Sequence, residues 1–331
     1  MNKPIDMKQL ISRYREIPLV LLIITLFLII NIRTPGFISP SNIYKILDDT
    51  CILMIIGMAQ LLVLLIGGID LSIGSTMALS GMSVAMLNQY NPDIPILALV
   101  AITLLIGAVL GAFNGVLVAY GNIPAIITTL GTINIYRGFT FLLSGGQWVG
   151  AHEMTDGFMA IPNTPFLGIS SMIWVTVIVI VFLFLFTNYS VRGREIYALG
   201  NNETASIFAG IKTKKVKLTS FILSGVLASL AGLLYVTNYA SAQNDTATTF
   251  ELQAVAACVI GGVSITGGIG TVPGVVLGAF FIGIVNNALP VIDLSPFYQM
   301  AIHGFVILLA IVSNTLMDRR TERLILQKRS L

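Results

Sequence analysis

The fold of this 331-residue chain is decided between residues 50 and 75, which read TCILMIIGMAQLLVLLIGGIDLSIGS. As far as Ile66 the stretch is almost wholly apolar, and a helix needs about 20 such residues to cross a bilayer. Gly67 and Gly68 then interrupt it, Asp70 follows, and a second apolar run starts near Ser75. A carboxylate between two apolar runs predicts a membrane helix that is broken at or near membrane depth.

The composition of the whole chain points the same way. Hydrophobic residues make up 56% and charged residues 10%, against roughly 25% charged residues in a soluble domain. So few charges cannot cover a soluble protein, which excludes soluble enzymes, nucleic-acid binders and disordered chains. The net charge of +3 is too small to indicate a polyanionic partner, and the 31 glycines suit close packing of helices in lipid.

Apolar runs recur along the chain and predict about ten membrane spans. They lie at 18–32, 50–66, 75–88, 94–120, 123–143, 166–187, 216–240, 252–266, 271–288 and 296–316. Because the backbone must satisfy its own hydrogen bonds in lipid, the spans are expected to be helices. The prediction is an all-α, polytopic membrane protein that forms one domain over residues 1–331, with some of its helices broken.

Lys and Arg residues set the expected orientation in the membrane. Of the 18, four lie in the N-terminal segment 1–16, six in the loop 188–217 and five in the tail 317–331. The loops 88–95, 144–165, 241–251 and 289–295 contain none. By the positive-inside rule, both termini and the loop 188–217 are cytoplasmic, and the membrane is the cell or inner membrane.

Two loops are candidates for contact with other proteins. In 188–217, Asn202 or Thr204 is suited to cap a short helix through Ala205 to Ala209, and Gly210 is suited to end it. Such a short helix on the cytoplasmic face can serve as a binding element for another protein. The polar outer loop 144–165 is either a docking surface or a simple connector.

The break at 67–75 has a counterpart near the C-terminus, Gly261-Gly262-Val263-Ser264-Ile265-Thr266, and the pentapeptide Val-Leu-Gly-Ala-Phe occurs at both 109–113 and 276–280. These fragments hint at an internal duplication, which is common in transporters. A phosphate loop at Gly270 is excluded, because no strand precedes it and no Lys follows.

Polar side chains within the spans are candidates for the translocation pathway or its gate. They are Asp70, Ser72, Asn114, Asn134, Arg137, Asn286 and Asn287. Asp70 and Ser72 either cap the helix after the break or act in a gate, and the two roles are compatible. Arg137 must pair, snorkel or face water, and Asp70 is one possible partner. The amides either join helices or bind hydroxyl-rich ligands. His303 is expected to be a packing residue.

The chain carries no sign of catalytic or metal chemistry. Cys51 and Cys258 lie in apolar runs and are expected to be buried thiols, without a disulfide or a metal. No cluster of His, Asp, Glu or Cys has catalytic spacing, and G-x-x-x-x-G-K-[ST] does not occur. We therefore expect a transport protein without its own ATPase site and without a cofactor.

Four motifs in order resemble the membrane subunits of bacterial sugar ABC importers of the ribose-permease type. They are residues 67–75; Thr129-Leu130-Gly131-Thr132 with Arg137-Gly138; 197–202 through Ala209-Gly210-Ile211; and 256–262 running on to 267–270. Within that family, residues 144–149 and 286–290 are most similar to rhamnose-type permeases, followed by autoinducer-uptake permeases.

The resemblance implies an ABC importer permease fold and a set of partners. These are a cytoplasmic ATPase, an external solute-binding protein, and a second permease copy or a sister permease. The helix at about 202–210 would then be the element that couples to the ATPase, with contributions from Gly200, Asn201, Asn202, Glu203, Ala205, Ser206, Ala209 and Gly210.

Two other classes of transporter remain open at this point. A branched-chain amino acid permease shares the superfamily and size of this chain. A channel or secondary transporter works without an ATPase, but usually has more ionisable residues in its spans than Asp70, Arg137 and His303.

Overall fold

The structure is a computed structural model that describes residues 16–291 and the single positions 298, 301, 304, 305, 308 and 312. His303, the tail 317–331, residues 1–15 and most of the predicted span 296–316 lie outside the described residues. The elements before the long outer loop are α2 (Ile17–Arg33), α3 (Pro40–Leu65), α4 (Ile73–Tyr90), α5 (Ile96–Ala119) and α6 (Ala125–Ser144).

The outer loop contains short elements only, and long helices resume after it. The loop holds β1 (Val149–Gly150), η1 (Ala151–Glu153), α7 (Asp156–Met159), β2 (Pro165–Phe166) and β3 (Ile169–Ser170). After it come α8 (Ser171–Tyr189), α9 (Val191–Asn201), α10 (Glu203–Phe208), α11 (Thr213–Tyr239), β4 (Ser241–Ala242), α12 (Phe250–Ile260) and α13 (Val272–Val291). β1 pairs with β4, and β2 with β3, both antiparallel.

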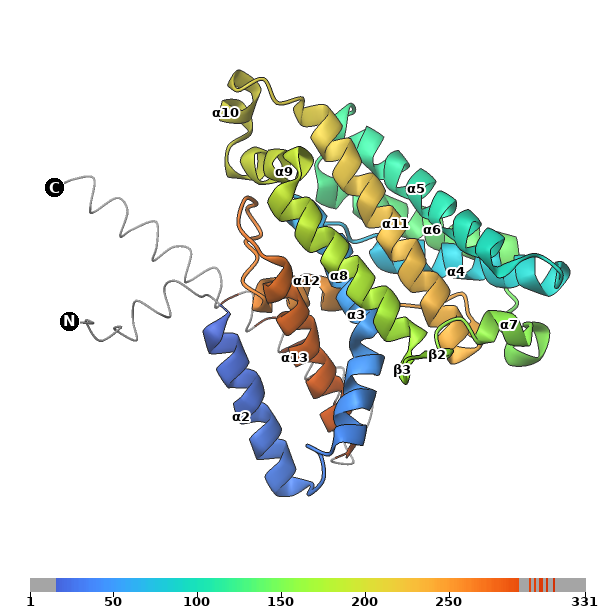
Figure 1. Cartoon of the computed structure of the whole chain (residues 1–331). Coiled ribbons are helices and arrows are strands. Elements are labelled where there is room, and N and C mark those ends of the chain that lie inside the picture. The colour runs from blue at the N-terminus through green and yellow to red at the C-terminus, as the bar shows by residue number, and fades with distance from the viewer. Residues whose placement is uncertain are drawn as a thin grey trace, which may run out of the picture.

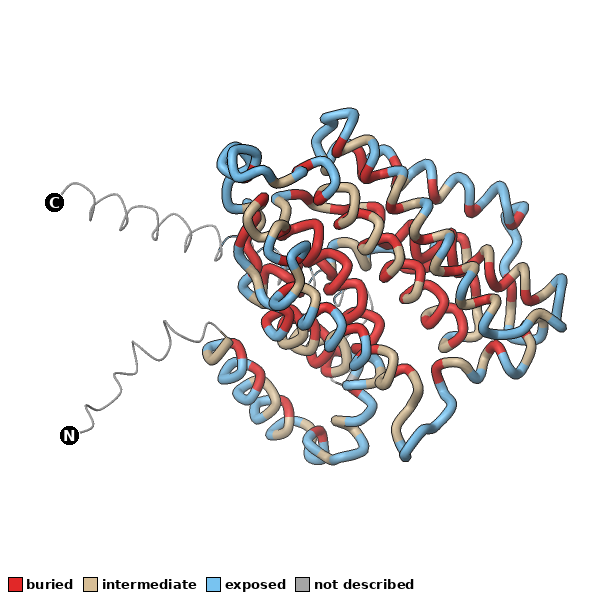
Figure 2. The backbone as a smooth tube through the Cα atoms, turned by 45° about the horizontal axis from the view of Figure 1, so that its top comes forward, coloured by how far each residue is buried: buried red, intermediate tan, exposed pale blue. Residues whose placement is uncertain are grey.

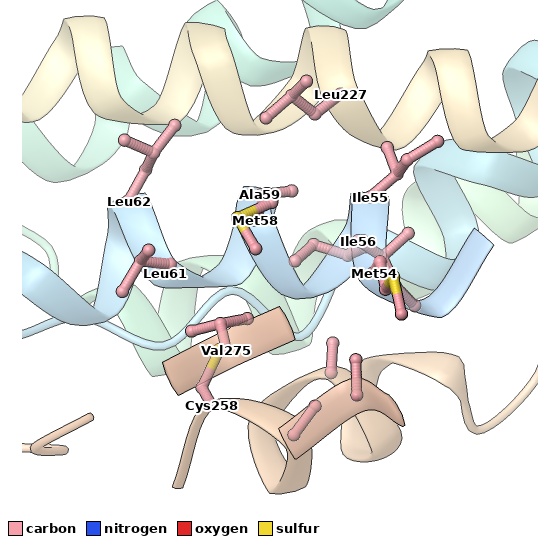
Figure 3. Packing of buried hydrophobic residues seen from close by; sticks show 14 of the residues in the cluster. Met54, Ile55, Ile56, Met58, Ala59, Leu61, Leu62, Leu227, Cys258 and Val275 are labelled. Atoms are coloured by element: carbon pink, nitrogen blue, oxygen red, sulfur yellow. The ribbon is translucent and has the colours of Figure 1, made fainter. Parts of the chain in front are cut away.

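Helix α3 is the centre of the bundle. In the most apolar 18-residue stretch of α3, 83% of the residues are buried. In the corresponding stretches of α5, α6 and α8, only 22–28% are buried. Figure 3 shows the Met54, Ile55 and Leu62 side chains of α3 between α11 on one side and Cys258 and Val275 of α12 and α13 on the other. Figure 2 shows the same contrast between buried inner turns and exposed outer turns. The exposed apolar faces of α5, α6 and α8 are what a helix in contact with lipid presents.

Within the described residues, six helices are long and apolar enough to cross a membrane, by length and composition: α3, α5, α6, α8, α11 and α13. The count of ten predicted from the sequence is therefore not confirmed. Helices α2 and α12 are apolar but shorter. Helix α4 has 18 residues, most of them buried in protein, and a helix enclosed in this way does not need a lipid-facing surface.

Several predicted boundaries differ from the structure. Helix α3 begins ten residues before the predicted span, at Pro40, where the Ser39 side chain accepts from the Asn42 N–H and proline occupies the first turn. Residues 252–266 were expected to form one span, but α12 ends at Ile260. Most of the predicted loop 188–217 is helical, since α9 fills Val191–Asn201 with Ser190 as its N-cap.

Both glycine breaks end their helix in the same way. After α3, Gly67 has φ +77° and donates to Leu64, while Gly68 donates to Val63. After α12, Gly262 has φ +82° and donates to Val259, while Val263 donates to Cys258. Each is a Schellman motif, in which a left-handed residue satisfies the last carbonyls of the helix. The left-handed position is the first glycine of one pair and the second of the other, so the two breaks are one residue out of the register that their sequences suggest.

Small residues bring α5 and α11 into backbone contact. A Cβ added at Gly111 would meet the backbone of Phe221, and one added at Gly225 would meet the backbone of Gly107 and Gly111. This is the close helix packing that the high glycine content predicted.

The two ends of the bundle are different. In Figure 1, α9 and α10 lie at one end, while α7, β2 and β3 lie at the other. Helix α4 connects them: it starts at the first break, and near its far end Asn88 donates to Thr155 and Gln89 donates to Glu153 of the outer loop. We call these the α10 end and the outer-loop end.

Candidate functional site

The first break holds the carboxylate of Asp70 in a buried hydrogen-bond network. Asp70 Oδ1 accepts from the Ser72 N–H (2.9 Å) and the Ser72 hydroxyl (2.6 Å), and Oδ2 accepts from the Ser224 hydroxyl of α11 (3.3 Å). Asp70, Ser72 and Ser224 are all buried. With its amide turned to satisfy both partners, Gln60 of α3 donates to the Asp70 carbonyl and accepts from the Asp70 N–H.

The network continues from Ser72 into two further helices. Asn114 of α5 donates to the Ser72 hydroxyl (2.8 Å), and the Tyr136 hydroxyl of α6 lies 3.2 Å from Asn114 Oδ1 and donates to Leu110 (2.8 Å). Five helices or helix ends meet on this network. A substitution at Asp70 is therefore expected to alter hydrogen bonds that involve α3, α4, α5, α6 and α11.

The capping role predicted for Asp70 and Ser72 is found in an altered form. Helix α4 begins at Ile73 with Ser72 as its N-cap, but the Ser72 side chain makes no capping bond. Its hydroxyl is engaged by Asp70 and Asn114 instead. The N–H of the cap residue is satisfied by the Asp70 carboxyl group, which lies at the positive end of α4.

The hypothesis that Asp70 pairs with Arg137 is wrong. Arg137 Nη1 donates to the carbonyls of Asn244 (3.1 Å) and Thr246 (2.6 Å), in the segment between β4 and α12. Among the residues that the structure describes, no cation pairs with Asp70. Arg137 therefore holds a non-helical segment against α6, and the Ser144 hydroxyl adds a bond to Asn244 Oδ1 (2.7 Å).

Sequence reasoning missed Glu251, which it assigned to an outer loop. Its Oε2 is buried, accepts no hydrogen bond from any residue that the structure describes, and lies against Gly74 in the first turn of α4. Arg137 interacts electrostatically with Glu251 and Asp245. The signal in the sequence was its position directly before an apolar helix, but only the fold shows that α12 starts beside α4.

The four candidate asparagines separate into three places. Asn114 belongs to the Asp70 network. Asn134 lies on the exposed side of α6, and among the described residues it donates to the Leu130 carbonyl of its own helix. Asn286 donates to Gln253 (3.4 Å) and Asn287 donates to Asp49 (3.2 Å), nearer the outer-loop end.

The short capped helix predicted in the loop 188–217 is confirmed as α10. It is capped by Asn202, whose side chain accepts from the Ala205 N–H (2.9 Å), and not by Thr204. Gly210, with φ +81°, follows its end. Ser206 is its one buried residue, whereas Ala205 and Ala209 are exposed. Ile207 and Phe208, which were not singled out in the sequence, are 56% and 87% exposed.

Glycine backbones join α9 to both helix breaks. The Gly268 N–H donates to the Leu65 carbonyl (2.9 Å), and Gly267 lies against Gly67. Gly200 of α9 packs on Leu65 and Gly268 so closely that a Cβ would overlap their backbone atoms. We call Leu65, Gly67, Gly200, Gly267 and Gly268 the glycine junction. Nearby, the Tyr197 hydroxyl donates to the Gly270 carbonyl (2.8 Å).

An ion pair and a cavity lie beside the glycine junction at the α10 end. Asn201 lies against Gly268, and Glu203 of α10 pairs with Lys217 of α11 at 2.6 Å. A cavity of about 430 Å³ lies between this ion pair, the first break and the α5–α6 connection. In the described part of the chain, no three His, Cys, Asp or Glu residues are placed to hold a metal ion. Both cysteines are buried and free.

Comparisons with known proteins place this arrangement in a family. The family described as branched-chain amino acid transport system / permease component matches residues 42–311. The chain belongs to this permease family. Together with the six apolar helices, this makes it a multi-pass membrane protein of the transport type.

The relatives include permeases of known sugar-import systems. The chain is 40% identical to the ribose import permease of Haemophilus influenzae over 88% of this chain and 90% of the relative. It is 37% identical to the ribose import permease of Escherichia coli, over the same shares. It is 33% identical to the autoinducer 2 import system permease of Salmonella typhi, over 91% of this chain and 86% of the relative. No solved structure matches the chain.

Proposed function

We propose that this chain is the membrane-spanning permease subunit of an ATP-driven importer for a sugar or a sugar-like solute. The observation that carries the proposal is the identity of 40% with a ribose import permease along nearly the full length of both chains. The more distant identity with autoinducer 2 import permeases supports the same class of solute, which is small and rich in oxygen.

The partners follow from the same relationship. The permease works with a cytoplasmic ATPase, an external solute-binding protein, and a second permease copy or a sister permease. Helix α10 is the element that enters the ATPase, because it is capped and short and exposes Ile207 and Phe208. Apolar side chains on an otherwise polar, basic end are typical of a protein contact.

We further propose ten crossings of the membrane with both termini in the cytoplasm. The six long apolar helices supply six of them, and α2, α4, α12 and the predicted span 296–316 supply the rest. The α10 end is then cytoplasmic and the outer-loop end faces outward. The distribution of Lys and Arg supports this orientation.

Transport requires that the ATPase changes the conformation of the translocation pathway. The glycine junction is the proposed connection between the ATPase contact at α10 and that pathway. Helix α9 is continuous with the α10 cap at Asn202 and packs through Gly200 on the ends of both helix breaks. A displacement of α10 therefore pushes on backbone atoms, which cannot yield as a flexible side chain would. The first break carries Asp70 and its network, and that network is the proposed gate.

Asp70, Ser72, Asn114, Asn134, Arg137, Asn286 and Asn287 remain the proposed pathway and gate residues. We add Glu251 to this set. Its buried carboxylate oxygen, which no described residue satisfies, destabilises the fold, and a destabilising polar group beside a helix break is a candidate functional group.

A branched-chain amino acid is the second candidate solute, because the matching family carries that description. Uptake into membrane vesicles that contain the chain, its ATPase and its binding protein decides between the two. We expect ATP-dependent uptake of labelled D-ribose, L-rhamnose or autoinducer 2. Uptake of L-leucine without uptake of any sugar would contradict the proposal. Uptake that persists without the ATPase would indicate a secondary transporter.

A further inference from the structure

Near the outer-loop end, four helices line a partly open cavity of about 410 Å³ with polar and apolar walls. We call it the outer pocket. Its polar lining comes from three helices, and its aromatic lining comes from Tyr239 and Phe250. The polar residues are Lys45, Asp49 and Thr50 of α3, Gln253 of α12, and Asn286 and Asn287 of α13. The volume lies in the range of small-molecule sites, about 300–1,000 Å³.

The position of the pocket in the bundle is fixed by α11. Tyr239 is the last residue of that helix, whose first residues lie beside α10. The pocket is therefore at the opposite end of α11 from the proposed ATPase contact. It lies on the side from which a binding protein would deliver a solute.

The aromatic side chains form one cluster at the rim. The rings of Tyr235 and Tyr239 are 4.6 Å apart, and those of Tyr235 and Phe250 are 5.6 Å apart and nearly perpendicular. Tyr239 is 56% exposed, although it belongs to this cluster. An aromatic ring held by its neighbours with a free face suits the C–H face of a sugar ring.

The polar lining complements hydroxyl groups. Three amides offer donors and acceptors, and Asp49 offers acceptors only. Asn286 Oδ1 is buried and accepts no hydrogen bond from any described residue. A buried carbonyl oxygen without a donor is unfavourable, so Asn286 has hydrogen-bonding capacity that no described residue uses. Lys45 and Asp49 contribute one charge of each sign, and the three neutral amides supply most of the remaining hydrogen-bonding groups, which suits an uncharged polyhydroxyl solute.

We infer that the outer pocket is a low-affinity sugar site, in which the solute stacks on Tyr239 and is hydrogen-bonded by Gln253, Asn286, Asn287 and Asp49 before it reaches the Asp70 network. The inference rests on the proposed sugar-import function and adds to it a site and the residues that select the solute. A second cavity of about 400 Å³ on the other side of Tyr239 and Phe250 contains Gln243 and Asp245 and extends this polar and aromatic surface.

The first test is uptake by the complete transporter, assayed with the sugar that the wild-type complex takes up among D-ribose, L-rhamnose and autoinducer 2. We expect Tyr239→Ala and Gln253→Ala to lower uptake at least about fivefold at wild-type membrane abundance, since one such contact is worth close to that factor. Tyr239→Phe keeps the ring and is expected to retain at least half. Tyr90→Ala is the matched control, because Tyr90 is 70% exposed, ends α4, and does not line the pocket.

A second test reads occupancy without transport. In a Cys51→Ser, Cys258→Ser background, the thiol introduced by Tyr239→Cys is expected to react more slowly with maleimide when the same sugar is added to the purified protein. The thiol introduced by Tyr90→Cys is expected to react at an unchanged rate. If Tyr239→Ala does not accumulate in the membrane, uptake by Gln253→Ala and this protection assay decide whether the outer pocket binds the sugar.

Uptake within twofold of wild type in both alanine variants, or no protection by the transported sugar, would overturn the inference while sugar import itself stood. A wild-type complex that takes up no sugar would instead contradict the proposed function. Protection by L-leucine and not by sugar would assign the pocket to amino acids.

Discussion

At the scale of single residues, Asp70 is the position where a structural and a functional role can be separated. Its carboxylate accepts three hydrogen bonds and has no cationic partner among the described residues. An amide at this position keeps the acceptor for Ser72 and can still bond Ser224, but unlike a carboxyl group it cannot ionise at the start of α4.

We therefore expect Asp70→Asn to reach the membrane in normal amount and to take up sugar more slowly than wild type. Asp70→Ala leaves the Ser72 N–H and two hydroxyls without their acceptor, which costs about 1–3 kcal/mol for a buried group. That variant should lower membrane abundance as well. Labelled-sugar uptake and immunoblot of membranes measure the two effects, and full uptake by Asp70→Asn would reduce Asp70 to a structural residue.

The Asp70 site was only partly predictable from the sequence. The carboxylate between two apolar runs was enough to identify Asp70, Ser72 and the helix break. The partners on α5 and α11 could not be found, because Asn114 and Ser224 are separated from it by 44 and 154 residues and no local pattern links them. Opposite charge suggested Arg137 as a partner, but Arg137 satisfies backbone carbonyls that have no signature in the sequence.

At the scale of elements, Gly200 tests whether the glycine junction transmits motion. A Cβ at this position would overlap the Leu65 carbonyl and the Gly268 N–H, and both are backbone atoms. We expect Gly200→Ala to displace α9 from the breaks and to lower ATP-dependent uptake strongly.

The matched control is Gly138→Ala in α6, where a Cβ meets nothing within 4 Å. Alanine there should be neutral or stabilising by about 0.5–1 kcal/mol, because glycine is unfavourable within a helix. Uptake and membrane abundance of the two variants are compared directly. Equal uptake would show that the junction tolerates an extra carbon and does not couple α9 to the gate.

Helix α10 carries the second prediction at this scale. Asn202→Ala removes the side-chain acceptor of the Ala205 N–H and should destabilise α10 by about 1 kcal/mol, whereas Asn202→Ser preserves a capping group. Ala205→Arg leaves the cap intact but adds a bulky charge to the exposed surface, and Phe208→Ala removes an exposed aromatic ring.

All of these except Asn202→Ser are expected to reduce co-purification of the ATPase from solubilised membranes, with Ala205→Arg the most severe. Thr219→Ala serves as the control on the same end of the molecule, because Thr219 is half-buried and its hydroxyl donates to the Lys215 carbonyl of its own helix. Recovery of the ATPase at wild-type yield with Ala205→Arg would exclude α10 as its contact.

The elements show where sequence patterns succeed and where they fail. A capping residue, small residues and a closing glycine predicted α10 almost to the residue, because capping is local chemistry. The same loop also contains α9, which the sequence did not predict. Its basic residues were interpreted as signals of membrane topology and not as part of a helix. The two glycine breaks were found by composition, but their contact through Gly268 and Leu65 depends on the packing of α3 against α12 and α13.

At the scale of the whole molecule, orientation in the membrane is the remaining prediction. The loop 144–165 and the loop 188–217 are separated by a single long apolar helix, α8, of 19 residues. Such a helix is about 28 Å long, which matches the hydrocarbon core of a bilayer. We therefore expect the two loops to lie on opposite sides of the membrane, and the six Lys and Arg residues of 188–217 predict that this loop is the cytoplasmic one.

Single cysteines in a Cys51→Ser, Cys258→Ser background test this orientation, since both native thiols are buried. Trp148→Cys is expected to react with a membrane-impermeant maleimide in intact cells, because Trp148 is 62% exposed at the outer-loop end. Phe208→Cys, at a position that is 87% exposed on α10, should react only after the membrane is permeabilised. Labelling of Phe208→Cys from outside would invert the orientation. Helix α10 would then face away from the ATP supply, so the same experiment also decides whether the glycine junction is on the side where an ATPase can act.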